Sequence, residues 1–433
     1  MSQIRSIHAV RRKKKPSASL FNFVFGLLIS LTTLWVFVAW SYYHVATQQE
    51  QEPVVEPPIK KISSPVVQTE AARYTPVVNK MSLDIVEQTK LEQHPDATHA
   101  KLLSKTGNQQ QLVAPPLKLQ TYPPIDSVVT SEYNVTGDVS FMVDFAIVGF
   151  PKCGTSTMME YLDQSPHTKV AQKERCELGS GRQAKLIREL YEELPEGNYK
   201  RGIKCPRDLE NEFAVEAYTK YFPNTHFLIG LRHPVLWFES FYNFRVYNNN
   251  PMRPAAELVG NCGKGSRHVC THRARFHQYL ANLGKTRLEG AEKNFFAQHG
   301  RELRMNPVKG NIFLYHVEQL RDDEPTLRQL AMRKDLTTFL GLPEVLPPMK
   351  IWRKPGKNIT QVQRDDADSK RLDICHSNHT QVRIALIEQA KMTAEWILQY
   401  FLKSNDVYVS SPSHFRDLLK AWEVDPCTHE TPK

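Results

Sequence analysis

The stretch that decides the fold reads Phe145-Ala-Ile-Val-Gly149, followed directly by Phe150-Pro-Lys-Cys-Gly-Thr-Ser-Thr157. The run of apolar residues predicts a buried strand, and the Gly, Thr and Ser residues after it predict a loop that opens a helix over about residues 156–163. Backbone N–H groups of such a loop, the positive end of the helix dipole and the Lys152 amine would converge on one spot. The stretch therefore predicts an anion site at the carboxyl end of a strand.

The order of residues in this loop indicates which kind of anion site it is. It is not the GxxxxGK[ST] pattern of nucleotide triphosphatases, because the lysine precedes the Gly-Thr-Ser-Thr run. The lysine-first order resembles the 5′-phosphosulfate loop of sulfotransferases, which reads roughly Pro-Lys-x-Gly-Thr-[Ser/Thr]-x-Leu, with Met158 here in place of the leucine. The resemblance implies that the sulfate donor contacts Lys152, Cys153, Gly154, Thr155, Ser156 and Thr157.

A second motif lies downstream, where residues 226–231 predict a strand that ends at Arg232. Pro234 suits the first position of the next helix, and Ser240 lies two helical turns in. Arg232 can fork onto a phosphate while Ser240 donates its hydroxyl; a surface arginine and a helix-interior serine are the alternative. With Tyr242, this element is similar to the 3′-phosphate-binding element of the same family. The two motifs imply 3′-phosphoadenosine 5′-phosphosulfate, a nucleotide with phosphate on both sides of its ribose, as the co-substrate.

The resemblance extends over about residues 144–357. Residues 314–320 and 339–342 are similar to a strand and a Phe-Leu-Gly-Leu segment that precede the family's last basic loop. That loop would be Trp352-Arg-Lys-Pro-Gly-Lys357, with Arg353, Lys354 and Lys357 near the 3′-phosphate, although a solvated basic turn is an alternative. Residues 375–433 match only loosely, and residues before 141 do not match.

The transfer reaction needs a base, because the acceptor hydroxyl must lose its proton as it attacks sulfur. In the heparan sulfate 3-O-sulfotransferases, which the loop resembles, a glutamate follows the loop lysine ahead of the next helix. Glu174 has the matching place, and Lys204 matches a family lysine expected at the sulfuryl group or acceptor. The histidine that other members carry in that strand is absent here. Glu177 and Asp208 remain alternatives for the base, and a solvated Glu174 is the structural alternative.

Residues 141–433 are expected to form one α/β domain, since short apolar runs alternate with amphipathic stretches. Three layers around a central parallel sheet are expected, and the resemblance implies the P-loop-like sulfotransferase fold. Further strands are expected at residues 199–204 and 311–316, and helices at residues 209–222, after Pro234 and around residues 386–401.

Residues 20–43 carry no charge, and 24 helical residues reach about 36 Å, enough to cross a hydrocarbon core of about 30 Å. A cleaved signal peptide is the alternative, but the run is longer than a usual apolar region and ends in aromatic residues. The basic residues 11–15 predict that residues 1–19 are cytosolic and that the chain is a single-pass type II protein. Residues 44–140, rich in Pro, Gln, Val and Thr, are expected to be a largely disordered lumenal stem. The resemblance adds a Golgi location.

Seven cysteines are expected to pair in an oxidising compartment, and their odd number leaves one over. The expected pairs are Cys262 with Cys270 and Cys375 with Cys427. No spacing suggests zinc, so no metal is predicted. Sequons at Asn134, Asn358 and Asn378 agree with a lumenal domain.

The net charge of +10 falls to about +4 without the six cations that precede Glu50, which suits an anionic ligand and gives little support for nucleic-acid binding. We therefore expect transfer of a sulfuryl group to a hydroxyl, or alternatively an amine, of a glycan partner. The acceptor itself, and whether it is instead a protein tyrosine, is left open. The alternatives are a secretory-pathway kinase and a non-catalytic, membrane-anchored glycan-binding protein, in which loss of Lys152 or Arg232 would be expected.

Overall fold

The computed structural model describes residues 116–130, 134–286, 290–298, 307–321, 327–349, 365–366 and 368–428. The expected membrane anchor at residues 20–43, the sequon at Asn358 and the basic loop with Arg353, Lys354 and Lys357 lie outside these ranges. Within them, no helix combines the length and the apolar character that crossing a membrane requires.

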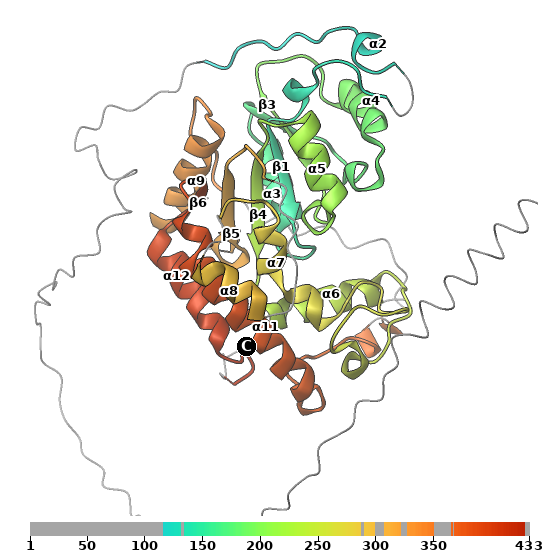
Figure 1. Cartoon of the computed structure of the whole chain (residues 1–433), viewed down its shortest axis with the longest axis vertical. Coiled ribbons are helices and arrows are strands. Elements are labelled where there is room, and N and C mark those ends of the chain that lie inside the picture. Colours follow the sequence, from blue (N-terminus) through green and yellow to red (C-terminus); the bar gives the residue numbers. More distant parts are fainter. Residues whose placement is uncertain are drawn as a thin grey trace, which may run out of the picture. The chain divides into compact units, whose positions relative to one another are not determined.

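The described residues form a six-stranded sheet in the order β2-β3-β1-β4-β5-β6, and every neighbouring pair is parallel (Figure 1). The central parallel sheet expected from the sequence is thereby confirmed. The strands are β1 (Phe145–Gly149), β2 (Thr168–Val170), β3 (Lys200–Lys204), β4 (His226–Leu231), β5 (Ile312–His316) and β6 (Val407–Val409).

Helices cover both faces of this sheet, because successive residues of each strand point to opposite sides. Phe145 and Ile147 of β1 pack with helices α3 and α9, whereas Ala146 and Val148 face the larger core formed with the other long helices. The α-helices are α2 (Ile125–Val128), α3 (Thr155–Asp163), α4 (Gln183–Glu193), α5 (Glu212–Tyr221), α6 (Pro234–Tyr247), α7 (Phe276–Ala281), α8 (Ala291–Gln298), α9 (Leu327–Leu340), α11 (Thr380–Gln399) and α12 (Pro412–Lys420). The result is the expected three-layer α/β arrangement.

The strand order changes direction beside β1. The chain leaves β1 through α3 on one face, whereas the segments that follow β3 and β4 lead into α5 and α6 in the other core. The loops after β1, β3 and β4 therefore diverge at the carboxyl edge of the sheet, the usual ligand position in open parallel sheets.

The helix expected at residues 209–222 begins later than predicted. Asn211 caps α5, since its side-chain oxygen accepts hydrogen bonds from the N–H groups of Phe213 and Ala214. Phe213 is 64% exposed, while Ala214 and Tyr218 are buried. The apolar pattern was extended backward through Leu209, which lies in a separate 3₁₀ turn, Asp208–Glu210.

The boundary expected at residue 140 lies inside a segment that packs on the domain. Val128, Val129 and Val139 are buried in the core. Tyr122 donates its hydroxyl to the carbonyl of Leu194 and accepts from the guanidinium of Arg201. The described part of the expected stem, from residue 116 onward, is therefore attached to the sheet at β3.

All seven cysteines lie in described ranges. The two expected disulfides, Cys262–Cys270 and Cys375–Cys427, are confirmed, and a third joins Cys176 to Cys205. Cys153 is the cysteine left over, and it is buried.

Candidate active site

The loop after β1 is shaped by two residues with positive φ. Lys152 has φ 70° and Gly154 has φ 76°, a region that non-glycine residues occupy rarely. Gly154 precedes α3, and no side chain caps this helix, so its first N–H groups have no side-chain acceptor. The Lys152 amine lies 4.7 Å from the ring centre of Phe244.

The loop lies close against β4, the strand that carries the second motif. A Cβ atom on Gly230 would meet the carbonyl oxygen of Cys153 at 2.1 Å, so only glycine permits this approach. Gly149 and Gly230 are also partners in the β1–β4 register. The two predicted phosphate elements are therefore neighbours.

Arg232 directly follows β4 and supplies the charge of the second element. Its Nε is buried and has no hydrogen-bond partner among the described residues. Burial lowers the pKa of its guanidinium, and the charge of Arg321 lowers it further. A buried guanidinium donor that lacks a partner is costly unless a ligand satisfies it, so this atom fits an anionic ligand.

Ser240 and Tyr242, the other members of the second motif, lie on α6. Ser240 is half-buried, two turns from the start of the helix. Tyr242 instead donates its hydroxyl to the carbonyl oxygen of Arg253 at 3.2 Å. The tyrosine thus stabilises the segment after α6.

The structure brings Lys204, Glu174 and the anion loop together. The Lys204 amine donates to Oε1 of Glu174 at 2.7 Å and to the hydroxyl of Ser156 at 3.0 Å. The Lys204 side chain is 3% exposed and that of Glu174 is 58% exposed. Glu174 can therefore meet a substrate from solvent, while Lys204 holds it beside the loop.

The segment that carries Glu174 is fixed from three directions. The N–H of Arg175 donates to the carbonyl of Lys204 at 2.8 Å. The Arg175 guanidinium pairs with Glu189 and Glu193 of α4, and the neighbouring Cys176 is bonded to Cys205. These contacts hold the backbone on the C-terminal side of Glu174 in place.

The two alternative bases lie in different surroundings. Asp208 is 2% exposed and accepts a hydrogen bond from Tyr218 at 3.0 Å. Burial raises the pKa of Asp208 to about 8. Glu177 is half-buried, with no hydrogen-bond partner at Oε2 in the described part of the chain. Asp208 with Cys176 and Cys205 would have the composition of a metal site, but both sulfur atoms are used in the disulfide.

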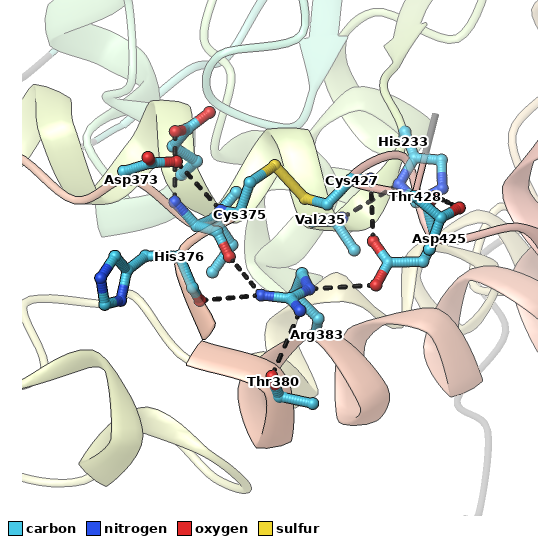
Figure 2. The surroundings of a disulfide bond; sticks show 12 residues. His233, Val235, Asp373, Cys375, His376, Thr380, Arg383, Asp425, Cys427 and Thr428 are labelled. Carbon is cyan, nitrogen blue, oxygen red and sulfur yellow. Dashed lines mark hydrogen bonds and ion pairs between the residues drawn. A yellow bond between two sulfur atoms is a disulfide. The ribbon is translucent and has the colours of Figure 1, made fainter. Parts of the chain in front are cut away.

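The C-terminal segment contacts the residue that follows Arg232. His233 accepts a hydrogen bond from the N–H of Val235 (Figure 2), and its ring lies 3.3 Å from the carbonyl oxygen of Val424. Trp422 donates its ring N–H to His316 at the end of β5, at 3.1 Å. Burial lowers the pKa of His233 to about 4 and that of His316 to about 3, so both are uncharged at neutral pH.

The Cys375–Cys427 disulfide links this C-terminal segment to the residues that precede α11 (Figure 2). Arg383 of α11 binds the carboxylate of Asp425 at 3.0 Å and the carbonyl oxygens of Ile374 and His376. The loosely matched C-terminal residues are thus part of the structure around His233, the residue that follows Arg232.

Two features near the site were not predicted from the sequence, namely Arg321 and the Cys176–Cys205 disulfide. Arg321 acts electrostatically on Arg232 and directly follows the stretch at residues 314–320 that carried the resemblance. The Cys176–Cys205 disulfide joins positions 29 apart and has no local pattern that announces it.

Comparison with known proteins adds little to this geometry. No protein-family model matches the chain, and no curated protein is similar to it in sequence. Among solved structures, it is similar to a sulfotransferase from Alicyclobacillus acidocaldarius, with 17% sequence identity and a TM-score of 0.38. That match covers 59% of this chain and 96% of the bacterial chain. At this TM-score the similarity decides nothing about activity, and the site must be interpreted from its own residues.

Proposed function

We propose that the chain is a sulfotransferase that moves a sulfuryl group from 3′-phosphoadenosine 5′-phosphosulfate to a hydroxyl of a glycan. The observation that supports this proposal is that the two predicted phosphate-binding elements follow adjacent strands, β1 and β4. Lys152 and the N-terminus of α3 form one element, and the unpartnered Arg232 Nε forms the other. A nucleotide with phosphate at both its 5′ and 3′ sides fits such a pair.

The residues around the proposed site have distinct roles in this proposal. Lys152 and the N–H groups of residues 154–157 bind the 5′ end and neutralise negative charge on the oxygen that leaves sulfur. Arg232, with Ser240, binds the 3′-phosphate. Arg353, Lys354 and Lys357 remain candidates for the same phosphate, by resemblance alone.

Glu174 is the proposed general base. It would accept the proton of the acceptor hydroxyl as the oxygen attacks sulfur, while the oxygen bridging sulfur and phosphorus leaves with the bond electrons. Lys204 reaches both Glu174 and the donor loop, so it orients the base relative to the donor. Asp208 is less suited, because it is buried and bound to Tyr218.

The first test is retention of the purified chain on a resin that bears adenosine 3′,5′-bisphosphate, followed by elution with the free nucleotide. Labelled donor offered with a panel of polysaccharides and a tyrosine peptide then identifies the acceptor class. A chain that binds adenosine triphosphate with Mg²⁺, and not the bisphosphate, would contradict the proposal in favour of a kinase. Binding to glycans without bisphosphate binding would support the non-catalytic alternative.

The proposed setting is the Golgi lumen, with residues 20–43 as the membrane anchor and residues 1–19 in the cytosol. Exposed Asn378 and Asn134 and the disulfides are compatible with a lumenal domain. Glycosidase treatment of the chain from a eukaryotic host should increase its mobility in gel electrophoresis. An unchanged band would remove the main support for this topology.

A further inference from the structure

The hydroxyl of Tyr315 is buried beside the proposed donor loop. Tyr315 belongs to β5, its side chain is fully buried, and its hydroxyl makes no hydrogen bond to any residue that the structure describes. The proposed reaction assigns it no role. A buried hydroxyl without a partner destabilises the folded chain, because it gives up its hydrogen bonds to water and receives none in return. Only a new partner can recover that free energy.

Two glycines locate this hydroxyl relative to the donor loop. A Cβ atom on Gly230, the register partner of Tyr315, would meet both the carbonyl oxygen of Cys153 and, at 2.7 Å, the hydroxyl oxygen of Tyr315. The two oxygens therefore lie beside the same point, although they form no hydrogen bond in this state. A Cβ atom on Gly154 would meet Cε2 of the Tyr315 ring at 3.7 Å. The ring thus packs against the peptide that joins Cys153 to Gly154.

This peptide connects the buried hydroxyl to the proposed anion site. A trans peptide is planar, so its C=O and its N–H point in opposite directions. The carbonyl oxygen, from Cys153, lies beside the Tyr315 hydroxyl. The N–H belongs to Gly154, the residue before α3, and is among the proposed ligands of the 5′ end of the donor. A hydrogen bond from Tyr315 to the carbonyl would fix the direction of that N–H and polarise it into a stronger donor.

The chemistry of the two groups suits this hydrogen bond. Burial raises the pKa of the Tyr315 hydroxyl well above its usual value, and the neighbouring Cys153 thiol raises it further, so the hydroxyl keeps its proton. A carbonyl oxygen only accepts, and it is a better acceptor than a thiol sulfur. The Cys153 carbonyl is therefore the natural partner of the hydroxyl once the loop adjusts.

We propose that Tyr315 is a positioning residue of the donor site. When the donor binds, the Tyr315 hydroxyl donates to the Cys153 carbonyl oxygen, and the Gly154 N–H is thereby held toward the 5′-phosphate. The inference rests on the proposed function and adds to it a residue that touches neither the nucleotide nor the acceptor. Because the hydrogen bond forms only in the complex, it contributes to donor affinity and not to the stability of the free chain.

The test compares Tyr315→Phe with Tyr161→Phe in the full-length, detergent-solubilised chain. Both tyrosines lie in the same apolar cluster, but Tyr161 already donates to the carbonyl oxygen of Pro347 at 2.9 Å. Tyr315→Phe should keep or raise the thermal midpoint and weaken binding of adenosine 3′,5′-bisphosphate about fivefold, the effect of one lost hydrogen bond. Tyr161→Phe should lower the midpoint by about 2 °C and change that affinity less than about twofold.

The two monophosphates of adenosine distinguish positioning from a general effect on the site. Tyr315→Phe should weaken binding of adenosine 5′-monophosphate about fivefold, because the Gly154 N–H serves the 5′ end. Binding of adenosine 3′-monophosphate should change less than about twofold, since this ligand does not reach that N–H. Calorimetric competition against the bisphosphate measures both affinities on the same samples.

The inference is overturned if Tyr315→Phe binds the bisphosphate as tightly as the unmodified chain, if it weakens both monophosphates equally, or if it lowers the thermal midpoint as Tyr161→Phe does. Any of these outcomes, with normal bisphosphate binding by the unmodified chain, refutes the role of Tyr315 alone. Absence of bisphosphate binding by the unmodified chain refutes the proposed function, and the role of Tyr315 with it.

Discussion

The Lys204 amine bridges the Glu174 carboxylate and the Ser156 hydroxyl, at 2.7 and 3.0 Å. One buried cation thus joins the end of β3, the segment after β2 and the first turn of α3. In the proposed reaction these three positions belong to the base and the donor loop, so their relative placement does not depend on the substrate. Pre-organisation of this kind lowers the entropy lost on reaching the transition state.

Glu174→Gln should reduce turnover by roughly 10²–10⁴-fold, because glutamine keeps the size of the side chain and loses the proton acceptor. Bisphosphate affinity and thermal stability should stay near normal, and Glu177→Gln is the matched control. Turnover assays and calorimetry on the same samples check this. If the Glu177 variant is inactive and the Glu174 variant is active, Glu177 is the base.

In Lys152→Gly, turnover should fall while thermal stability is kept or increases. Glycine relieves the positive φ of this position, which costs a non-glycine residue roughly 1–2 kcal/mol, while its greater freedom in the unfolded chain offsets roughly 0.5–1 kcal/mol. We therefore expect a thermal midpoint equal to or above that of the unmodified chain, with turnover reduced by roughly 10²-fold or more. Lys152→Ala should lose the same activity without the gain. Retained turnover in both variants would refute the role of this loop.

Arg232→Lys should weaken bisphosphate binding by roughly 1.5–3 kcal/mol, since lysine keeps the charge and loses the planar fork. Titration calorimetry measures this, with adenosine 5′-monophosphate as the second ligand. The loss should be small for the monophosphate, which lacks the 3′ group. An equal loss for both nucleotides would place Arg232 at the other phosphate.

The buried Asp208 should make the free energy of unfolding depend on pH. Its pKa rises from 3.8 to about 8 on burial, so the folded chain binds more protons than the unfolded chain between those values. The contribution is fully present below about pH 4 and is lost as the pH rises through about 8. Asp208→Asn, which still accepts from Tyr218, should flatten the fall in urea midpoint between pH 5 and 8. The exposed Asp417→Asn should leave that slope unchanged.

Replacing both Cys176 and Cys205 by alanine should lower the free energy of unfolding by roughly 3.5 kcal/mol, from the loop-closure entropy of 29 residues. The same change at Cys262 and Cys270, 8 residues apart, should lower it by roughly 2.5 kcal/mol. Turnover at a temperature where both variants are folded should fall more in the first, because that bond anchors the Glu174 segment. Equal turnover in the two variants would show that the contacts of Arg175 suffice.

The central strands were predictable and the edge strands were not. β1 and β4 are covered on both faces and therefore have continuous apolar runs, which fixed their bounds. β2 and β6 have three residues each at the two edges of the sheet, too few for a pattern. The start of α5 was predicted too early. The cap residue Asn211 was a local signal for the correct start, but the prediction followed the apolar periodicity instead.

The same distinction applies to the site. Arg232 directly follows β4, and Lys152 comes three residues after the end of β1, so their position at the carboxyl edge could be predicted from the chain. The contact between Glu174 and Lys204 spans 30 residues and was not predicted, because the family resemblance indicated the two residues only separately.

The C-terminal segment also determines when the proposed site can be completed during synthesis. Trp422, Val424 and Cys427 contact His316, His233 and Cys375, so residues that are synthesised late pack against the ends of β4 and β5, which are synthesised much earlier. The proposed donor site should therefore become complete only after these late residues have been synthesised and the Cys375–Cys427 disulfide has formed.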